Sequence, residues 1–348
     1  MKIITIEEHF NSRNVREKMK QYQSNVLDAG KAKDMHEMIR HFLPTDDNIE
    51  RILKNISSDD DIEDVGERRI KFMDESGIDM QVISYAGGSP QEIADPVAAV
   101  ALCKEANDEL AGYISQNPTR FAGFAALPLA DPISAANELE RAVKNLNFKG
   151  ALLAGTFQGK FFDDAEFFPI FEKAAELNVP IYMHPGIIDK GVADHYFRNE
   201  NWSKLVNGVF PSAGFGWHMD SGIHILRLIL SGVFDKLPNL KLISGHWGEF
   251  VPSFLERLDE TLYPEITNLK RKISEYYKEH VYITPSGIFS ETQLQFAIAQ
   301  MGADHIIYSG DYPYLINKNT GNFLKNASIS EEDKEKIGHL NVEKLLNL

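Results

Sequence analysis

The sequence contains almost no cysteine and fewer basic than acidic side chains. Cys103 is the one cysteine among 348 residues, so neither an internal disulfide bond nor a zinc site built from several thiolates can form. The 36 lysines and arginines stand against 51 aspartates and glutamates, which gives a formal charge of −15. Since nucleic-acid binding draws on a basic surface, we expect no nucleic-acid partner. A secreted scaffold held together by disulfides is excluded as well.

Long apolar runs are also missing. No stretch approaches the roughly 18 apolar residues that a membrane span requires, and no basic amphipathic segment points to a membrane surface. The chain starts MKIITIEEHF, in which acidic side chains appear from Glu7 on, and this is not the pattern of a signal peptide. We therefore expect a protein without membrane contact that is located in the cytoplasm.

The remaining composition is that of an ordinary globular protein, with 43% hydrophobic and 25% charged residues. Eight short apolar or β-branched runs recur along the chain, and most of the segments between them have helical periodicity. The predicted strands are residues 2–6, 81–85, 121–127, 150–154, 180–184, 241–246, 281–284 and 306–309.

Strands that are apolar throughout and alternate with helices are typical of a parallel sheet covered by helices. Eight such units favour an α/β fold of the (β/α)8 TIM-barrel type, and an open doubly wound sheet is the alternative. No linker divides the chain, so residues 1–348 are expected to form a single domain. The polar stretch 11–63 is expected to be a partly helical insertion between strands 1 and 2, near the barrel mouth; the alternative is a solvated surface excursion.

Polar residues gather where four of the predicted strands end, which is the end that carries the chemistry in a barrel of this kind. The first strand leads into Glu7 and His9, which point to the same side because side chains alternate along a strand. The fifth, sixth and eighth strands lead into His184, His246 and Asp311. We expect these side chains to converge at the barrel mouth.

Imidazoles and carboxylates without sulfur suit a single divalent cation. Glu7 and Asp311 would neutralise its charge, and mixed nitrogen and oxygen donors favour Zn²⁺ or Mn²⁺ over Ca²⁺ or Mg²⁺. For each residue taken alone, the alternative is a structural hydrogen-bonding role. The agreement of four strand ends favours the metal site.

Three further charged residues extend the candidate site. Glu249 follows His246 by three positions, so it either orients that imidazole or caps a helix. Arg69 and Arg257 can each bind a substrate carboxylate through the planar guanidinium group, or form ion pairs at a surface or interface.

Several of these motifs together resemble the amidohydrolase superfamily. They are the Glu-x-His of the first strand and the segments Tyr-Met-His-Pro (182–185), Ser-Gly-His-Trp-Gly-Glu (244–249) and Ser-Gly-Asp-Tyr-Pro-Tyr (309–314). Segments 69–79 and 224–235 are similar to its metal-dependent decarboxylase branch, which is related to aminocarboxymuconate-semialdehyde decarboxylase. Within this branch, the chain most resembles the hydroxybenzoate decarboxylases that act on γ-resorcylate, 2,3-dihydroxybenzoate and 5-carboxyvanillate.

The resemblance implies a role for each candidate residue. The metal ligands would be Glu7, His9, His184 and Asp311. The catalytic residues would be Asp311, His246 and Glu249, with the last two acting as a pair beside the substrate. The substrate contacts, some of them across a subunit interface, would be Arg69, Arg257 and Tyr314. Because the relatives are typically dimers or tetramers, a homodimer or homotetramer is expected.

The fourth predicted strand, 150–154, ends without a lysine or an acid, where binuclear hydrolases of the superfamily usually carry a bridging carboxylate. A mononuclear site is therefore expected. The resemblance implies non-oxidative decarboxylation of a hydroxylated aromatic acid, which releases CO2 and a phenol. Two alternatives remain: a mononuclear metal-dependent hydrolase of a lactone, ester or amide, and, more remotely, a non-catalytic barrel that binds a metal or ligand.

Overall fold

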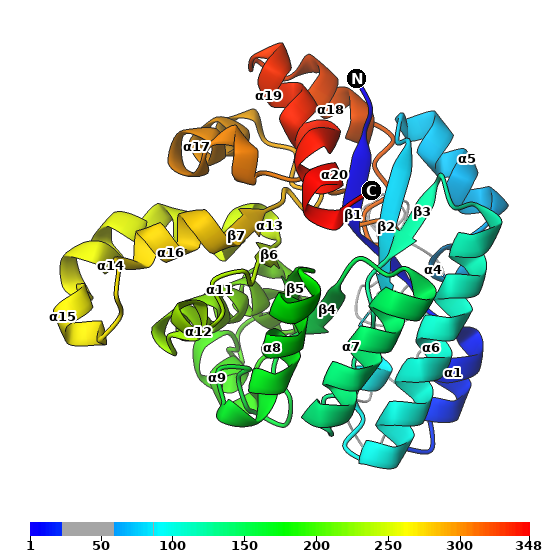
Figure 1. Cartoon of the computed structure of the whole chain (residues 1–348), viewed down its shortest axis with the longest axis horizontal. Coiled ribbons are helices and arrows are strands. Elements are labelled where there is room, and N and C mark those ends of the chain that lie inside the picture. Colours follow the sequence, from blue (N-terminus) through cyan, green and yellow to red (C-terminus); the bar gives the residue numbers. More distant parts are fainter. Residues whose placement is uncertain (23–58, 86) are drawn as a thin grey trace.

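The strands form two parallel sheets that together enclose a barrel (Figure 1). The computed structural model describes residues 1–22, 59–85 and 87–348. The first sheet has the order β1-β2-β3 and the second has the order β4-β5-β6-β7. The strands are β1 (Ile4–Phe10), β2 (Met80–Tyr85), β3 (Phe121–Gly123), β4 (Ala151–Ala154), β5 (Ile181–His184), β6 (Leu242–Ser244) and β7 (Val281–Ile283).

Isolated parallel bridges join the two sheets into a closed ring. These bridges are Ala125–Ala151, Ile283–Ile306 and Ile6–Ser309. The predicted eighth strand, 306–309, thus lies between β7 and β1, where Ile307 N donates to Ile283 O at 3.0 Å. The TIM-barrel prediction is confirmed, and the open-sheet alternative is wrong. The eighth strand pairs with each neighbour through a single bridge.

Helices cover the outside of the barrel (Figure 1). Asp95 and Asp131 cap two of them by accepting hydrogen bonds from the backbone N–H groups of Ala98 (2.8 Å) and Ser134 (3.1 Å). The helices are α1 (Arg13–Met19), α4 (Asp59–Glu63), α5 (Glu67–Ser76), α6 (Pro96–Gln116), α7 (Pro132–Leu146), α8 (Phe168–Leu177), α9 (Lys190–Tyr196), α10 (Lys204–Val209), α11 (Gly216–Leu230), α12 (Val233–Lys236), α13 (His246–Glu249), α14 (Leu255–Thr261), α15 (Pro264–Thr267), α16 (Ile273–His280), α17 (Glu291–Met301), α18 (Thr320–Asn326), α19 (Glu331–Glu335) and α20 (Asn341–Leu346).

The inside of the barrel is a packed apolar core. Alternate strand residues such as Leu152 and Ile243 point inward, and Val342 and Leu346 of α20 pack against them. Lys149, directly before β4, donates to the Asn347 carbonyl at 3.2 Å. The C-terminal helix therefore closes the end of the barrel at which the strands begin, and the opposite end is left for the site.

Two described helices, α1 and α4, belong to the predicted insertion 11–63. The backbone N–H of Asn11 donates to Ile62 O at 3.0 Å, and Arg13 Nε donates to Glu63 Oε2 at 2.8 Å. Both ends of the insertion therefore meet directly after β1. Its middle part, 23–58, lies outside the described residues.

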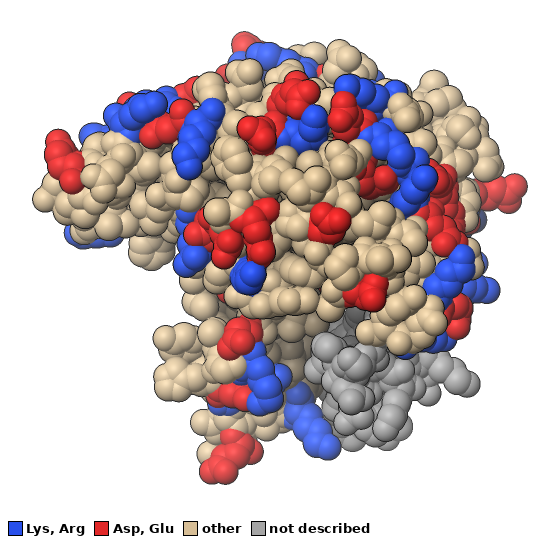
Figure 2. All heavy atoms as spheres, turned by 60° about the horizontal axis from the view of Figure 1, so that its bottom comes forward, with Lys and Arg blue, Asp and Glu red and all other residues tan. Residues whose placement is uncertain are grey.

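Figure 2 shows acidic and basic side chains interspersed over one face of the molecule, without a large field of either sign. In the described part of the chain, no helix is both long enough and apolar enough to cross a membrane.

Candidate metal and acid–base site

Strand β1 carries consecutive buried polar side chains into the barrel mouth. The strand runs to Phe10, past the predicted end at residue 6, and its pairing with β2 shifts register between Thr5 and Glu8. At this irregularity Glu7 has a φ of 63°. As a result Glu7 and His9 both face the mouth, whereas Glu8 points to the outer side. The predicted strand ended too early, at residue 6, because it followed the apolar run, and the next three residues are polar.

The structure brings five of the predicted site residues together. His9 Nε2 lies 3.3 Å from Asp311 Oδ1. Glu7 Oε1 lies 3.6 Å from His184 Nε2 and 4.0 Å from His246 Nε2. All five side chains come from the C-terminal ends of strands, so the barrel itself sets their spacing.

Several donor atoms in this cluster fit a divalent cation. Among the described residues, Glu7 Oε1 and His9 Nε2 are buried without a hydrogen-bond partner, an arrangement that is costly unless a cation binds them. His184 Nδ1 lies 2.7 Å from the Pro185 carbonyl oxygen, which leaves His184 Nε2 as the free ring nitrogen facing Glu7. Nitrogen and oxygen donors without sulfur are those of a Zn²⁺ or Mn²⁺ site.

Burial adjusts the protonation of these groups. It raises the pKa of Glu7 and of Asp311, while the nearby His246 acts in the opposite direction. It lowers the pKa of His9 to about 3 and that of His184 well below its usual value. Both imidazoles are therefore neutral at physiological pH, which is the form that binds metals.

Hydroxyl groups hold Glu7 in place. Ser286 Oγ donates to Glu7 Oε2, and Thr284 Oγ1 donates to the same oxygen at 3.3 Å. Ser286 Oγ also accepts from His246 N at 2.8 Å. A Cβ on Gly245 would lie 3.0 Å from Glu7 Oε1 and 2.8 Å from Ser286 Oγ, so glycine is needed there. These contacts occupy one carboxylate oxygen and leave Oε1 free.

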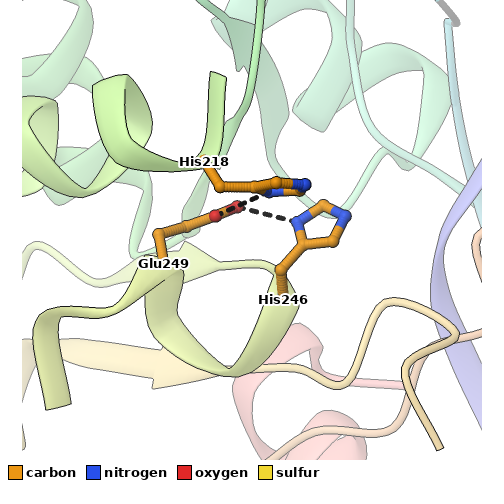
Figure 3. A group of neighbouring side chains, drawn as sticks. All are labelled: His218, His246 and Glu249. Atoms are coloured by element: carbon orange, nitrogen blue, oxygen red, sulfur yellow. Dashed lines mark hydrogen bonds and ion pairs between the residues drawn. The ribbon is translucent and has the colours of Figure 1, made fainter. Parts of the chain in front are cut away.

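His246 also belongs to a second group, the His246–Glu249–His218 triad, which Figure 3 shows. Glu249 Oε1 accepts from His246 Nδ1 at 2.7 Å, and Glu249 Oε2 accepts from His218 Nδ1 at 2.9 Å. Trp217 Nε1 donates to His218 Nε2 at 3.0 Å. His218 Nε2 also lies 3.2 Å from the Ala213 carbonyl oxygen, and the Glu249 carboxylate orients both imidazole rings.

The triad also settles the role of Glu249. Residues 246–250 all have positive φ values, from 47° to 82°, so the chain makes a left-handed turn after β6 in which Glu249 faces His246. The helix-capping alternative for Glu249 is wrong, because both carboxylate oxygens accept from imidazoles. Burial raises its pKa to about 7, and the hydrogen bond from His218 opposes this shift.

His218 was not among the predicted site residues. It lies on α11, in the long segment between β5 and β6, and reaches Glu249 through the packing of that helix. A strand-end pattern cannot reveal it.

The two arginines lie outside this cluster. Arg69 is fully buried, donates from Nε to the Asp64 carbonyl at 2.8 Å and from Nη2 to the His9 carbonyl, and lies 4.8 Å from the centre of the Tyr312 ring. These contacts engage the guanidinium within the protein and give Arg69 a structural role, while its predicted contact with substrate stays a prediction.

Arg257 and Tyr314 differ in their placement. Arg257 lies on α14, its side chain is 70% exposed, and it pairs with Glu260 at 3.0 Å. In this position the guanidinium points to solvent and not into the donor cluster of its own subunit. Its role stays a prediction. The ring centre of Tyr314 lies 5.3 Å from that of His9, and burial raises the pKa of Tyr314 well above its usual value. Tyr314 thus lines the space beside the donor cluster.

A TIM barrel with a mononuclear nitrogen and oxygen donor set at its strand ends defines a class of metal-dependent enzymes. The chain belongs to the amidohydrolase family, whose sequence model matches residues 34–348. It is 39% identical over 305 residues to γ-resorcylate decarboxylase from Polaromonas sp., an alignment that covers 82% of this chain and 88% of the relative. The decarboxylase orsB of Emericella nidulans is 36% identical over 299 residues, covering 83% and 87%.

Solved structures give the same relationship. A dihydroxybenzoic acid decarboxylase from Polaromonas sp., solved with manganese and the inhibitor 2-nitroresorcinol, has 34% identity and a TM-score of 0.82, covering 100% of this chain and 97% of the other. A 5-carboxyvanillate decarboxylase from Novosphingobium aromaticivorans, solved with manganese and a nitrobenzoic acid, has 29% identity and a TM-score of 0.84, covering 100% and 96%. The predicted family and decarboxylase branch are confirmed.

Proposed function

We propose that this protein is a metal-dependent decarboxylase that removes CO2 from a benzoate carrying a hydroxyl group next to the carboxylate. The observation that carries the proposal is the similarity to γ-resorcylate decarboxylases over 82% of this chain, within a fold shared with two manganese-containing decarboxylases. The donor cluster at the barrel mouth supports it, because its unpaired atoms match a single cation.

Four residues would hold the metal, Mn²⁺ or Zn²⁺: Glu7, His9, His184 and Asp311. When bound, the cation supplies positive charge that fixes the carboxylate and the adjacent phenolate oxygen of the substrate. Ser286 and Thr284 orient Glu7 for this role by occupying its second oxygen. Tyr314 would face the aromatic ring.

Asp311 would deliver the proton in the chemical step. A proton from the substrate phenol first passes to the Asp311 carboxylate. Burial raises the pKa of this carboxylate and so favours its protonated form. Asp311 then protonates the ring carbon that bears the carboxylate. The carbon–carbon bond breaks, its electron pair returns to the ring, and CO2 leaves. The product phenolate then takes up one proton from the solvent and becomes the phenol, so one proton is consumed overall. His246, oriented by Glu249, would steady the charge on Asp311 during the transfer.

The proposal is tested by incubating the manganese-loaded protein with a panel of hydroxybenzoates and measuring CO2 and the phenol. We expect release of both from at least one acid with an ortho-hydroxyl group, and none from a benzoate lacking that group. A metal-loaded protein that is inert to the panel but cleaves lactones would be a hydrolase, and the proposal would be wrong.

Replacing Glu249 with glutamine is expected to lower kcat by about 100-fold, the lower range of what a positioned acid–base side chain contributes. The amide keeps one acceptor oxygen but sets an NH2 group against one of the two imidazole N–H donors. Metal content should stay at the wild-type level, as measured by elemental analysis, and the exposed Glu256→Gln serves as the control. If Glu249→Gln loses the metal, the cation is bound by the His246–Glu249–His218 triad and not by the four proposed ligands.

We also propose that the protein assembles as a homodimer or homotetramer. Large apolar side chains stay exposed in segment 202–215 and just before α14: Trp202 (41%), Phe215 (39%), Phe250 (46%) and Phe254 (59%). The rings of Phe215 and Phe250 are 4.9 Å apart, so part of this surface is continuous. Exposed apolar patches of this kind mark protein interfaces. Arg257 lies beside Phe254, where it could reach the site of a neighbouring subunit.

Arg257→Ala is accordingly expected to raise KM roughly tenfold while kcat changes little, because a charged contact to the substrate carboxylate is lost. Steady-state kinetics measure the effect, and Arg227→Ala, which breaks an exposed pair with Asp163, is the matched control. An unchanged KM would remove Arg257 from the substrate site.

Two broader features complete the proposal. The chain would act as one domain. The insertion 11–63 would shape the barrel mouth, because the contact between Asn11 and Ile62 places both ends of the insertion directly after β1. A cytoplasmic location is supported by the single free cysteine, Cys103, which suits a reducing compartment.

A further inference from the structure

The side chain of Glu8 binds the loop that carries Asp311. Glu8 is completely buried and lies on the opposite face of β1 from Glu7 and His9. Its Oε1 accepts from the backbone N–H of Gly310 at 2.9 Å, and its Oε2 accepts from that of Tyr312 at 3.0 Å. One carboxylate therefore holds the peptide groups on both sides of Asp311.

A second layer of contacts fixes Glu8 itself. Gln81 Nε2 donates to Glu8 Oε2 at 3.1 Å, and Arg69 Nη1 donates to Gln81 Oε1 at 3.4 Å. Arg69 also donates to the His9 carbonyl. The buried guanidinium thus connects β1 and β2 behind the donor cluster, which explains why it is engaged within the protein.

The backbone at Asp311 needs such support. Asp311 has a φ of 60°, a left-handed conformation that residues other than glycine seldom adopt. At Gly310 a Cβ would lie 3.1 Å from Glu8 Oε1, so the loop approaches the carboxylate too closely for a side chain there. Without the two hydrogen bonds, the loop could relax and carry the Asp311 carboxylate away from His9.

We infer that Glu8 is a positioning residue that holds Asp311 in the geometry needed for metal binding and proton delivery. The inference rests on the proposed function, which makes Asp311 both a metal ligand and the proton donor. Glu8 is not one of the four proposed metal ligands, and it would act through the Gly310 and Tyr312 backbone N–H groups. This assigns separate tasks to the two adjacent glutamates of β1, since Glu7 faces the cation site and Glu8 shapes the opposite wall of it.

The test is Glu8→Gln, because a glutamine side chain sets an N–H donor against a loop N–H or the Gln81 donor. We expect Mn²⁺ binding by the metal-free protein to weaken by about 10–100-fold, as is typical when support of a metal site is removed. The Mn²⁺ electron paramagnetic resonance spectrum of the bound ion should broaden or shift. We also expect kcat to fall by a similar factor, with KM changing less.

Glu138→Gln is the matched control. Glu138 is a buried carboxylate on α7 that accepts from Asn107 Nδ2 at 2.7 Å, far along the chain from the site. It is expected to lower the unfolding temperature without changing Mn²⁺ affinity or kcat. If Glu8→Gln behaves in the same way, with reduced stability and unchanged Mn²⁺ affinity, Glu8 is merely structural and the inference is overturned.

A thermodynamic cycle shows whether Glu8 acts through Asp311. Mn²⁺ affinity is measured for the wild type, Glu8→Gln, Asp311→Asn and the double variant. We expect Glu8→Gln to lower Mn²⁺ affinity only slightly when Asp311 is already asparagine, since the effects of coupled residues are not additive. Additive losses would contradict the inference. If Glu8→Gln does not fold, the Mn²⁺ affinity of Gln81→Met is measured instead, because this variant removes the hydrogen bond from Gln81 to Glu8. An unchanged Mn²⁺ affinity of Gln81→Met would overturn the inference.

This design separates the two hypotheses. Mn²⁺ binding requires no substrate. If Glu8→Gln lowers Mn²⁺ affinity but the wild type releases no CO2, the positioning role of Glu8 stands and the decarboxylase proposal is wrong. If the wild type releases CO2 but Glu8→Gln binds Mn²⁺ normally, the decarboxylase proposal stands and the positioning role of Glu8 is wrong.

Discussion

Asp311→Asn is expected to lower kcat for CO2 release by at least about 1,000-fold, within the range that a positioned acid contributes. The amide has nearly the same shape but cannot deliver a proton to the ring carbon. Initial rates at saturating substrate measure the effect. Because Asp311 Oδ1 also faces His9 at 3.3 Å, the assay is run with excess Mn²⁺ and with bound metal quantified, so that lost metal is not mistaken for lost acid.

Asp304→Asn is the matched control for this variant. Asp304 lies on the surface with its side chain 67% exposed and pairs with Lys336, so its substitution should leave kcat unchanged. Substantial turnover by metal-loaded Asp311→Asn would mean that another group protonates the substrate. His246 would then be the first candidate, since its Nδ1 is fixed by Glu249 and its Nε2 faces the cluster.

His184→Ala is expected to abolish stable metal binding and, with it, decarboxylation. The loss of Mn²⁺ affinity should exceed the roughly 10–100-fold effect of removing a residue that only supports a ligand. The reason is geometric: the contact of Nδ1 with Pro185 leaves Nε2 as the ring atom facing Glu7 Oε1, 3.6 Å away. Elemental analysis of the purified protein and titration of the metal-free form with Mn²⁺ measure this directly.

The exposed His195 on α9 provides the comparison, because His195→Ala removes an imidazole without touching the cluster. Metal content should be normal in that variant. If His184→Ala retained wild-type metal content, the donor set would have to be sought elsewhere, and the His246–Glu249–His218 triad is the group that would then hold the ion.

Much of the barrel could be predicted because its signals are local. Apolar runs such as 150–154 and 180–184 correspond closely to β4 and β5, since strands buried on both faces need apolar side chains throughout. The length of β1 could not be read in this way. Before its last residue, Phe10, it contains Glu7, Glu8 and His9, which remain in the strand because the barrel interior and the Asp311 loop supply partners for them.

The candidate site divides along the same line. Glu7, His9, His184, His246 and Asp311 could be singled out because strand ends meet at one side of a parallel barrel. His218 could not, because its contact with Glu249 depends on how α11 packs. The role of Arg69 depended equally on tertiary structure, since its acceptors are backbone carbonyls that no sequence pattern marks.

The most direct test of the account is decarboxylation of 2,6-dihydroxybenzoate by the manganese-loaded protein in D2O, followed by mass spectrometry and NMR of the product. The account predicts CO2 and resorcinol with one deuterium at the ring carbon that carried the carboxylate, and almost no product from Asp311→Asn. Recovery of unchanged acid from this and every other ortho-hydroxybenzoate, with metal bound, would contradict it.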